Sequence, residues 1–387
     1  MATFYVSKTG NDSNNGLSEG TAVLTIGAAE LLVDAAVSMG AATNTISIGD
    51  GTYTETVTYA GNNCTFISTS QDRTAVIITQ SNGSTFRLAK SSTGNAFKHL
   101  TIQNTDDGTN DNGIYGAQGG SSGAWASFTV EDCIFDCQST AIQYAQSCTI
   151  KRTKFLVNGG DNGSNVYGIK GGVGASGAVF TIEACLFVGW DKWAVAGGGG
   201  YMNMRNCTLV LDDSSQSTSY LLYWSGTSVE VYNSIFYGGD SAVDYGLRFQ
   251  SANSDNIAKN CIAFGALRIP YTNTGSPTVS SQLEDNSDVV SDGNTIFTAI
   301  GDAGVGDDYT INANGLARSR GLAAELGSDG KDVDGNDFDS SNPNIGCYAT
   351  VASGYSAATH VSGVAIGNLA SVNGVAKASI ASIDGVS

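Results

Sequence analysis

The chain has 387 residues, of which 41% are hydrophobic and only 14% are charged, with 50 glycines and 3 prolines. This apolar content is enough to build a core, so the composition excludes a disordered chain and a collagen-like one. The net charge is −18, and no cluster of Lys or Arg interrupts the acidic sequence. We therefore expect no binding to nucleic acid or anionic membranes, and none to a polyanionic glycan unless a cation bridges the two.

The apolar runs of the sequence are short. The first residues lack a basic region followed by an apolar run, and no window of about 18 apolar residues could span a membrane. We expect a protein that is made in the cytoplasm and is not inserted into a membrane.

Residues 1–44 predict a short strand and a single helix. The strand covers residues 4–6, and the turn-rich residues 7–16 follow it. Thr25 is a suitable N-cap, and Gly40 suits the C-terminal stop. A stacked fold leaves the end of its core open, so we expect this helix to cover that end. Its apolar residues recur at helical spacing and share one face: Ile26, Ala29, Val33, Ala36 and Val37.

From residue 45 the hydrophobic period changes to two, which predicts strands. One pattern then repeats along the middle of the chain: apolar, polar, apolar, polar, Asn, Cys, apolar. Residues 202–210 are a clear copy. The copies are 33, 20, 32, 22, 27 and 27 residues apart when they are aligned on one column of residues: Leu100, Cys133, Thr153, Cys185, Cys207, Ser234 and Cys261.

Each copy predicts two strands joined by a sharp bend. The residue before the column is Asn206, Asn233 or Asn260 in three copies, and Asn tolerates the left-handed backbone that such a bend requires. No helical pattern separates the strands, so the coils fit a right-handed parallel β-helix over residues 45–350, with strands stacked about 4.8 Å apart. Gly-rich insertions, such as residues 106–123 and 158–176, predict loops that could form a binding surface.

The chain has eight cysteines, and four of them fall in the aligned column. Because Thr153 and Ser234 occupy the same column, we interpret it as a row of small buried side chains. Disulfides between adjacent coils and a metal site are the alternatives. A cytoplasmic origin disfavours the disulfides, and the sequence lacks paired Cys-x-x-Cys motifs at zinc spacing.

Both ends of the β-helix resemble the pectin-lyase-like right-handed parallel β-helix proteins. At the start the resemblance rests on residues 5–12, on 24–29 and on 49–55, which read Gly-Asp-Gly-Thr-Tyr-Thr-Glu. At the end it rests on residues 332–336, Asp-Val-Asp-Gly-Asn, and on 343–348, Pro-Asn-Ile-Gly-Cys-Tyr, which resemble the closing coil of that group. The resemblance implies the fold over about residues 4 to 349. It leaves the activity open, because the group includes lyases, hydrolases, phage tail spikes and inert structural proteins.

The resemblance suggests two enzymatic schemes. A pectate-lyase-like β-elimination would use an Arg or Lys as the base, and Arg152 and Arg205 lie near predicted bends, although both also suit ion pairs on an outer face. A polygalacturonase-like hydrolysis would use paired carboxylates, and Asp106 and Asp107 imitate part of its motif. Neither motif is complete, so we assign no catalytic residue and keep these four as weak candidates.

The densest run of carboxylates lies near residue 335. Asp332, Asp334 and Asp337 could supply hard oxygen ligands to Ca²⁺, but the order of an EF-hand loop is absent. A solvated acidic loop is the simpler interpretation. Ca²⁺ is the one cofactor that the sequence leaves open.

Residues 351–387 form a tail in which Gly-Val recurs with a period of 11, at Gly363, Gly374 and Gly385. A Gly in every copy opposes a helix by about 1 kcal/mol each, whereas short β segments tolerate it. So few copies cannot bury an apolar face alone, so we predict an assembly or attachment tail rather than a flexible linker. Its repeats also resemble the tails of phage and environmental virion proteins. The apolar residues assigned to assembly are Val364, Leu369, Val372, Val375, Ile380 and Ile383.

The function we favour from the sequence is a non-enzymatic structural protein of a virus particle, such as a fibre, tail spike or decoration protein. We expect a homo-oligomer, with a trimer as one option, that binds other virion proteins through the tail and contacts host glycans. One alternative is a polysaccharide lyase or glycoside hydrolase with the same fold. Another is a bacterial surface adhesin.

Overall fold

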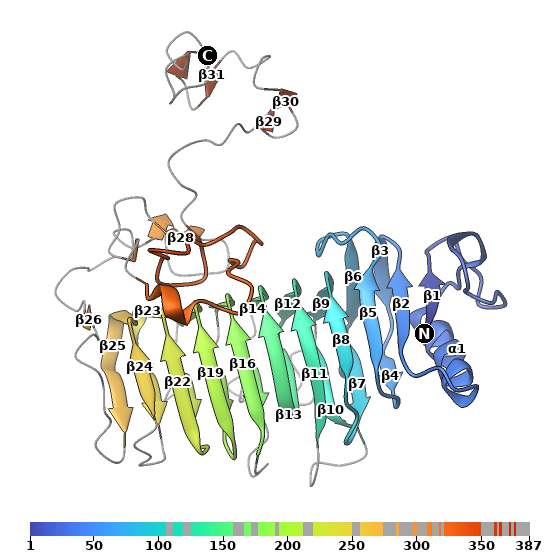
Figure 1. The fold of residues 1–387 in the computed structure, drawn as a ribbon, viewed down its shortest axis with the longest axis horizontal. Helices are drawn as coiled ribbons and strands as arrows, with labels where there is room; N and C mark the ends of the chain where they lie inside the picture. Colours follow the sequence, from blue (N-terminus) through green and yellow to red (C-terminus); the bar gives the residue numbers. More distant parts are fainter. Residues whose placement is uncertain are drawn as a thin grey trace.

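The computed structural model describes the following residues: 1–105, 111–118, 125–157, 166–171, 177–189, 193–211, 220–249, 256–273, 284–285, 297–299, 308–311, 317–318, 321–349, 360–361, 364–365, 371–372 and 375–376. Parallel strands stack along the long axis of the molecule, and helix α1 lies at one end of the stack (Figure 1). The predicted parallel β-helix is therefore confirmed.

The chain passes through three parallel sheets in each coil. The first sheet contains β1 (Ala2–Val6), β2 (Asn44–Ile48), β5 (Cys64–Ser68), β8 (Asn95–Lys98), β11 (Ala126–Glu131), the end of β13 (Ile142–Lys151), β16 (Val179–Glu183), β19 (Tyr201–Arg205), β22 (Ser228–Tyr232) and β24 (Ile257–Lys259). The second sheet contains β3 (Gly51–Thr54), β6 (Val76–Gln80), β9 (Thr101–Asn104), β12 (Ile134–Cys137), β14 (Lys154–Val157), β17 (Leu186–Val188), β20 (Thr208–Leu211), the starts of β23 (Ile235–Phe249) and β25 (Ile262–Asn273), and β26 (Glu284–Asp285).

The third sheet contains β4 (Val57–Tyr59), β7 (Phe86–Ala89), β10 (Ile114–Gln118), the start of β13, β15 (Tyr167–Gly171), β18 (Trp193–Gly197), β21 (Tyr220–Trp224) and the ends of β23 and β25. Inward side chains of the three sheets form one continuous core. Phe135, Phe155 and Phe187 stack in it with ring centroids 5.0 and 4.5 Å apart. Equivalent residues of successive coils thus lie in straight columns.

Helix α1 (Ile26–Ser38) covers the first coil, as predicted. Thr25 is its N-cap and accepts a hydrogen bond from the N–H of Ala28 at 3.1 Å. Glu55 accepts the N–H groups of Ile26 and Gly27, each at 3.0 Å, and so anchors the helix on the coil. The buried face differs from the prediction at its end, because Val37 is 44% exposed while the inward face carries Glu30 instead. A short 3-10 helix, η1 (Glu19–Thr21), precedes α1.

The bends between the first and second sheets explain the repeat. Asn206, Asn233 and Asn260 have φ of 51°, 50° and 49°, so the predicted left-handed bend is confirmed. At the next residue a small side chain donates a hydrogen bond to the carbonyl two residues earlier. Cys207 makes this bond to Arg205 O at 3.3 Å, and Ser234 makes it to Tyr232 O at 2.9 Å. All members of the column except Leu100 make this bond, so a small donor, and not merely a small side chain, suits the position, which is why Cys, Ser and Thr share it.

All eight cysteines are buried, free thiols. Burial raises the pKa of Cys133 and of Cys261 to about 12, so these thiols stay protonated near neutral pH. This result supports the interpretation of the column as a packed row.

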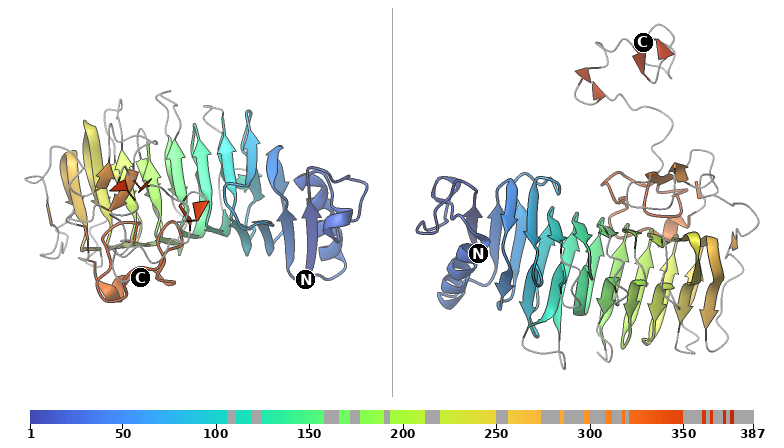
Figure 2. Two further views of the ribbon diagram at one scale, coloured as in Figure 1. Left: turned by 90° about the horizontal axis from the view of Figure 1, so that it is seen from above. Right: turned by 180° about the vertical axis from the view of Figure 1, so that it is seen from behind.

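Residues 321–349, which we call the closing segment, lie outside the coils (Figure 2). The sequence resemblance implied a closing coil here, but this segment contains the 3-10 helix η3 (Ala323–Glu325) and no strand. It covers the outward apolar side chains of the second sheet, including Val188, Val210 and Ile235, with Val333, Ile345 and Tyr348 among others. The outer face of β17, β20 and β23 is apolar, and burying it against a returning chain removes that surface from water. An antiparallel pair, β27 (Phe297–Ala299) and β28 (Asp308–Ile311), precedes the closing segment.

The tail repeat is visible as two matched β-hairpins. Strand β29 (His360–Val361) pairs antiparallel with β30 (Val364–Ala365), and β31 (Ser371–Val372) pairs with β32 (Val375–Ala376) in the same register, 11 residues later. Ser-Gly and Asn-Gly separate the paired strands in the sequence, and Asn-Gly is typical of two-residue hairpin loops. The predicted short β segments are present. Leu369, Ile380 and Ile383 lie outside the described residues.

Candidate functional site

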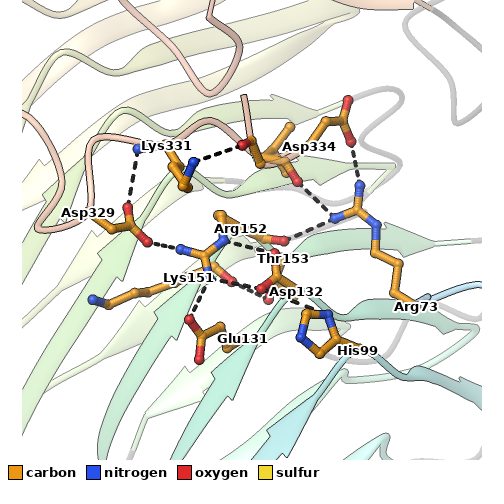
Figure 3. Close-up of polar contacts among 12 residues, drawn as sticks. Arg73, His99, Glu131, Asp132, Lys151, Arg152, Thr153, Asp329, Lys331 and Asp334 are labelled. Atoms are coloured by element: carbon orange, nitrogen blue, oxygen red, sulfur yellow. Dashed lines mark hydrogen bonds and ion pairs between the residues drawn. The ribbon is translucent and has the colours of Figure 1, made fainter. Parts of the chain in front are cut away.

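A cluster of charged side chains forms where three bends of consecutive coils meet residues 329–334, the tip of the closing segment (Figure 3). His99, Asp132 and Arg152 occupy the bend position where Ala184 and then three Asn residues lie in later coils, with φ of 54°, 52° and 46°. His and Asp are enriched in the left-handed region, whereas Arg gains nothing from it. Strained backbone of this kind often marks a functional or structural constraint, and at Arg152 the side-chain contacts provide one.

Arg152 is the centre of this charged cluster. Its Nε and Nη2 donate to the two carboxylate oxygens of Asp132, each at 2.8 Å. The guanidinium also pairs with Glu131 on the same neighbouring coil and with Asp329 on the closing segment. Its side chain is 8% exposed, so these pairs are shielded from water. Arg152 therefore links two coils and the closing segment at one point.

A second arginine holds the other side of the tip. Arg73, from the turn between β5 and β6, donates from Nη1 to Val333 O at 2.8 Å and to Arg152 O at 3.1 Å, and it pairs with Asp334. Lys154 Nζ lies 2.7 Å from the same carboxylate of Asp334. Cations from several coils thus converge on the tip of the closing segment.

The charges of the cluster suit attachment of the closing segment better than proton transfer to a substrate. The hydrogen bond to Asp132 raises the pKa of Arg152 above its usual value, although burial opposes this shift. Burial favours the neutral form of Glu131, but hydrogen bonds from Lys98 and Arg152 outweigh burial and lower its pKa. A general base needs a pKa near the working pH, and Arg152 is shifted away from it. The ion pairs of Arg152 therefore hold the closing segment on the coils.

A pocket of about 550 Å³ opens beside the charged cluster. His99 reaches it, with Nδ1 3.9 Å from Asp132 Oδ2. The pocket brings Arg and Lys side chains together with as many Asp side chains, so it presents no single sign of charge to a ligand. Its lining consists of Gln71, Asp72, Arg73, His99, Asp132, Arg152, Lys331, Asp334 and Gly335.

Arg205, the other basic candidate, lies at the end of β19 and is separate from the charged cluster. Its Nη1 is 2.5 Å from Glu325 Oε2 on the closing segment, and its guanidinium lies 5.0 Å from the ring centroid of Tyr232. Arg205 therefore provides a second ionic contact to the same segment. Asp106 and Asp107 lie outside the described residues.

The three aspartates considered for Ca²⁺ turn to different partners. Asp332 is buried and accepts the N–H groups of Asp334, Asn336 and Ala349 at 2.8–3.0 Å. Asp334 pairs with Arg73 and Lys154, and Asp337 pairs with Lys331 at 2.8 Å. Within the described part of the chain, no three His, Cys, Asp or Glu side chains gather as a metal site would require.

The outer column of the first sheet alternates in charge. Lys98, Glu131, Lys151, Glu183 and Arg205 lie in register on successive strands. Lys98 and Glu131 are 2.7 Å apart, and Lys151 and Glu183 are 3.4 Å apart. Opposite charges on neighbouring strands stabilise one register and neutralise one another. This column needs no external partner.

The outer column of the third sheet has a different composition, which the sequence alone did not reveal. The residues in register are Arg87, Tyr115, Gln143, Lys170, Ala196, Tyr223 and Arg248. None of them is acidic. Cations and aromatic rings that lie up to 161 residues apart in the sequence thus share one surface of an acidic protein.

A second aromatic row adjoins this column. Tyr167, Trp193 and Tyr220 stack along the axis with ring centroids 4.6 and 6.1 Å apart. Lys170 Nζ lies 4.6 Å from the centroid of Tyr167, and the guanidinium of Arg248 lies 5.2 Å from that of Tyr220. Trp193 is half-buried, whereas Tyr167 and Tyr220 are buried between their neighbours. We call the two rows, with the adjoining Tyr144, the aromatic face.

The aromatic face was missed because its residues are not close in sequence. A partial signal was available once the coils were aligned, since one inward stack consists of Phe and the outward rows consist of Tyr and Trp, although Tyr59 and Trp224 also lie in the core. Tyr and Trp combine a large apolar ring with a polar group and are favoured where a ring meets both protein and water.

No protein-family profile matches the chain, and no curated protein matches its sequence. Among solved structures it is similar to the pectate lyase Pel9A, with a TM-score of 0.52 and 15% identity over 90% of this chain and 96% of the lyase. Two pectin methylesterases align less well. The one from Aspergillus niger has a TM-score of 0.37 and 15% identity over 76% of this chain and 94% of its own. The one from carrot has a TM-score of 0.35 and 12% identity over 73% of this chain and 86% of its own. At these identities the likeness shows the fold alone: the chain is a parallel β-helix with an N-terminal capping helix, as in the pectate lyase structure.

Proposed function

We propose that the protein is a non-enzymatic structural component of a virus particle, a β-helical rod that binds a host glycan on its aromatic face and assembles through its tail. The observation that carries the glycan-binding part is the composition of the aromatic face. Tyr115, Trp193 and Tyr223 are partly exposed on it, and Lys170 and Arg248 lie over the buried rings of the second row. The faces of sugar rings carry C–H groups that the negative face of an aromatic ring attracts, and cations suit hydroxyl or acidic substituents.

The spacing of the coils supports an extended ligand. Neighbouring parallel strands lie about 4.8 Å apart, so equivalent side chains repeat along the rod at that interval. Sugar units of an extended glycan follow one another at a similar distance. A linear glycan lying along the axis could therefore meet one outward side chain of the aromatic face per unit.

The assembly part of the proposal rests on the tail. Each described hairpin has strands of two residues, and an isolated two-stranded hairpin is at most marginally stable in water. Repeated hairpins of equal register gain stability by pairing with sister chains or with another protein of the particle. Val364, Val372 and Val375 lie in these strands and are the described members of the proposed assembly set.

Clamping of the closing segment supports a structural role for the rod. Hydrogen bonds and ion pairs hold this segment on several coils. At one end Asn233 exchanges hydrogen bonds with the backbone of Leu322, and at the tip Arg73 donates a hydrogen bond to Val333 O. The cations that an elimination mechanism would use as bases, Arg152 and Arg205, are committed to this clamp. A polysaccharide lyase or hydrolase with the same fold is the rival proposal.

Two measurements test the proposal. The full chain is incubated with purified polysaccharides, and both retention on the glycan and release of unsaturated or reducing ends are followed. We expect retention without chain cleavage, and sustained cleavage would replace the proposal with the enzymatic one. Sedimentation of the full chain and of a chain ending at residue 350 tests assembly. We expect an oligomer only for the full chain, and equal sedimentation behaviour of the two would refute the role of the tail.

A further inference from the structure

We propose that Tyr144 is a positioning residue, held in a strained backbone conformation so that its ring completes a binding wall for a sugar unit at the rim of the aromatic face. This inference rests on the proposed glycan binding and names the residue that shapes one end of that site.

The backbone of Tyr144 is strained. Its φ is 59°, in the left-handed region that bulky residues avoid, and it lies inside strand β13 rather than in a loop. The pairing of β13 with β15 shifts register between Gln143 and Ala145, which identifies a β-bulge at Tyr144. Bulges re-aim side chains and are frequent next to functional sites.

The bulge replaces a loop at the corner between the third and first sheets. Seven residues separate β10 from β11, and seven separate β15 from β16, in the coils on either side. Strand β13 passes the same corner without a break. The connection between the two sheets is therefore shortest in the coil of Tyr144, between two coils whose connections are long.

The turned ring of Tyr144 meets aromatic side chains of the coil before it. The rings of Trp125 and Tyr144 are nearly parallel, with an interplanar angle of 13° and centroids 6.1 Å apart. The ring of Tyr115 contacts Tyr144 edge-on at 5.6 Å. Strand β10 accommodates the bulge, since a Cβ on Gly116 would lie 2.3 Å from Tyr144 O. The neighbouring strands β10 and β15 are thus both adapted to this conformation.

Lys170 connects this wall to the rest of the aromatic face. Its Nζ lies 5.9 Å from the ring centroid of Tyr144 and 4.6 Å from that of Tyr167. A cation between two rings can donate hydrogen bonds to a sugar whose ring faces the wall. Gly or Asn would relieve the strain at this φ, and the side chain found there instead is a ring that faces Trp125 and Lys170.

The test compares variants of Tyr144 that separate the effect of its backbone strain on stability from the effect of its ring on sugar binding. Tyr144→Asn accepts the left-handed backbone but lacks the ring, and Tyr144→Phe keeps the ring. Ser91→Asn is the matched control, because Ser91 has a φ of 60° and lies outside the aromatic face. The probes are hexa-galacturonate, cellohexaose and an oligodeoxythymidylate, with Kd from calorimetry and unfolding midpoints from circular dichroism.

We expect wild type to bind at least one of the two sugars and not the oligonucleotide. Tyr144→Asn should raise the unfolding midpoint and weaken sugar binding at least 10-fold, while Tyr144→Phe stays within about 3-fold. Ser91→Asn should leave Kd unchanged. If wild type binds a sugar and Tyr144→Asn binds it equally well, only this inference fails. If wild type binds neither sugar, or binds the oligonucleotide instead, the proposed glycan binding fails with it.

Discussion

Glu30 should make the N-terminal cap less stable as the pH rises. This carboxyl lies on the inward face of α1, where its side chain is buried. Burial, together with the charges of Glu55 and Asp34, raises its pKa from 4.5 to about 8. The folded cap therefore keeps the proton on Glu30 at pH values where the unfolded segment has released it.

The change in the free energy of unfolding with pH follows from the number of protons that each state binds. Between about pH 4.5 and 8 the folded state binds more protons than the unfolded state, so the free energy of unfolding falls as the pH rises. At pH 7 the loss relative to pH 4 is about 3 kcal/mol, since each pH unit is worth about 1.36 kcal/mol. Glu30→Gln cannot ionise. It should match wild type near pH 4 and be more stable by about 3 kcal/mol at pH 7.

Native-state hydrogen exchange of residues 26–38, read by mass spectrometry at pH 5, 6, 7 and 8, measures the opening free energy of this helix. The two proteins are compared at each pH, which cancels the intrinsic pH dependence of exchange. Glu19→Gln is the control, because Glu19 is an exposed carboxylate on the same cap. Its profile should parallel that of wild type. Parallel profiles for Glu30→Gln and wild type would show that Glu30 is solvated, and the reasoning from burial would be wrong.

Three further substitutions test the contacts that hold the coils and the closing segment. Arg152→Ala leaves Asp132, Glu131 and Asp329 without their shared partner and should lower the free energy of unfolding, measured in urea, by about 3–5 kcal/mol. Arg205→Ala removes a more exposed pair and should lower it by about 1 kcal/mol. Equal losses would contradict the role of Arg152 as the centre of the charged cluster. Cys207→Ser keeps the donor that the column requires and should be more stable than Cys207→Ala by about 1 kcal/mol in the same assay, and the reverse order would show that packing alone selects the thiol. Gly346→Ala places a Cβ 2.7 Å from Ile235 Cδ1 at a φ of 99°, so limited proteolysis should cut the closing segment faster than in wild type; unchanged cleavage would mean that this turn adjusts.

The coil architecture could be predicted from the sequence because its requirements are local. Each bend has a left-handed backbone, which Asn accepts, and a small donor usually follows it, so Asn206 with Cys207 and Asn233 with Ser234 give a pattern that can be read within single coils. The helix cap at Thr25 is local in the same sense.

The contacts of the closing segment could not be predicted in this way. Arg73 and Val333 are 260 residues apart, and their hydrogen bond depends on a chain that turns back along the outside of the coils. The bends at His99, Asp132 and Arg152 offered a clue, because they have charged or titratable side chains where the other bends have Ala184 or Asn. The sequence showed that these bends differ, but only the structure shows what they contact.

The two outer columns explain why net charge is a poor guide to the partners of this chain. Lys98, Glu131, Lys151 and Glu183 pair within their own column, so their charges neither attract nor repel a distant ligand strongly. The column that contains Lys170 and Arg248 holds cations without acids in register. Salt at about 0.15 M screens charges beyond about 8 Å, so the acidic remainder of the surface acts weakly on a ligand that lies on the aromatic face. A net charge of −18 therefore still disfavours nonspecific binding to nucleic acid, while local contacts decide what binds this face.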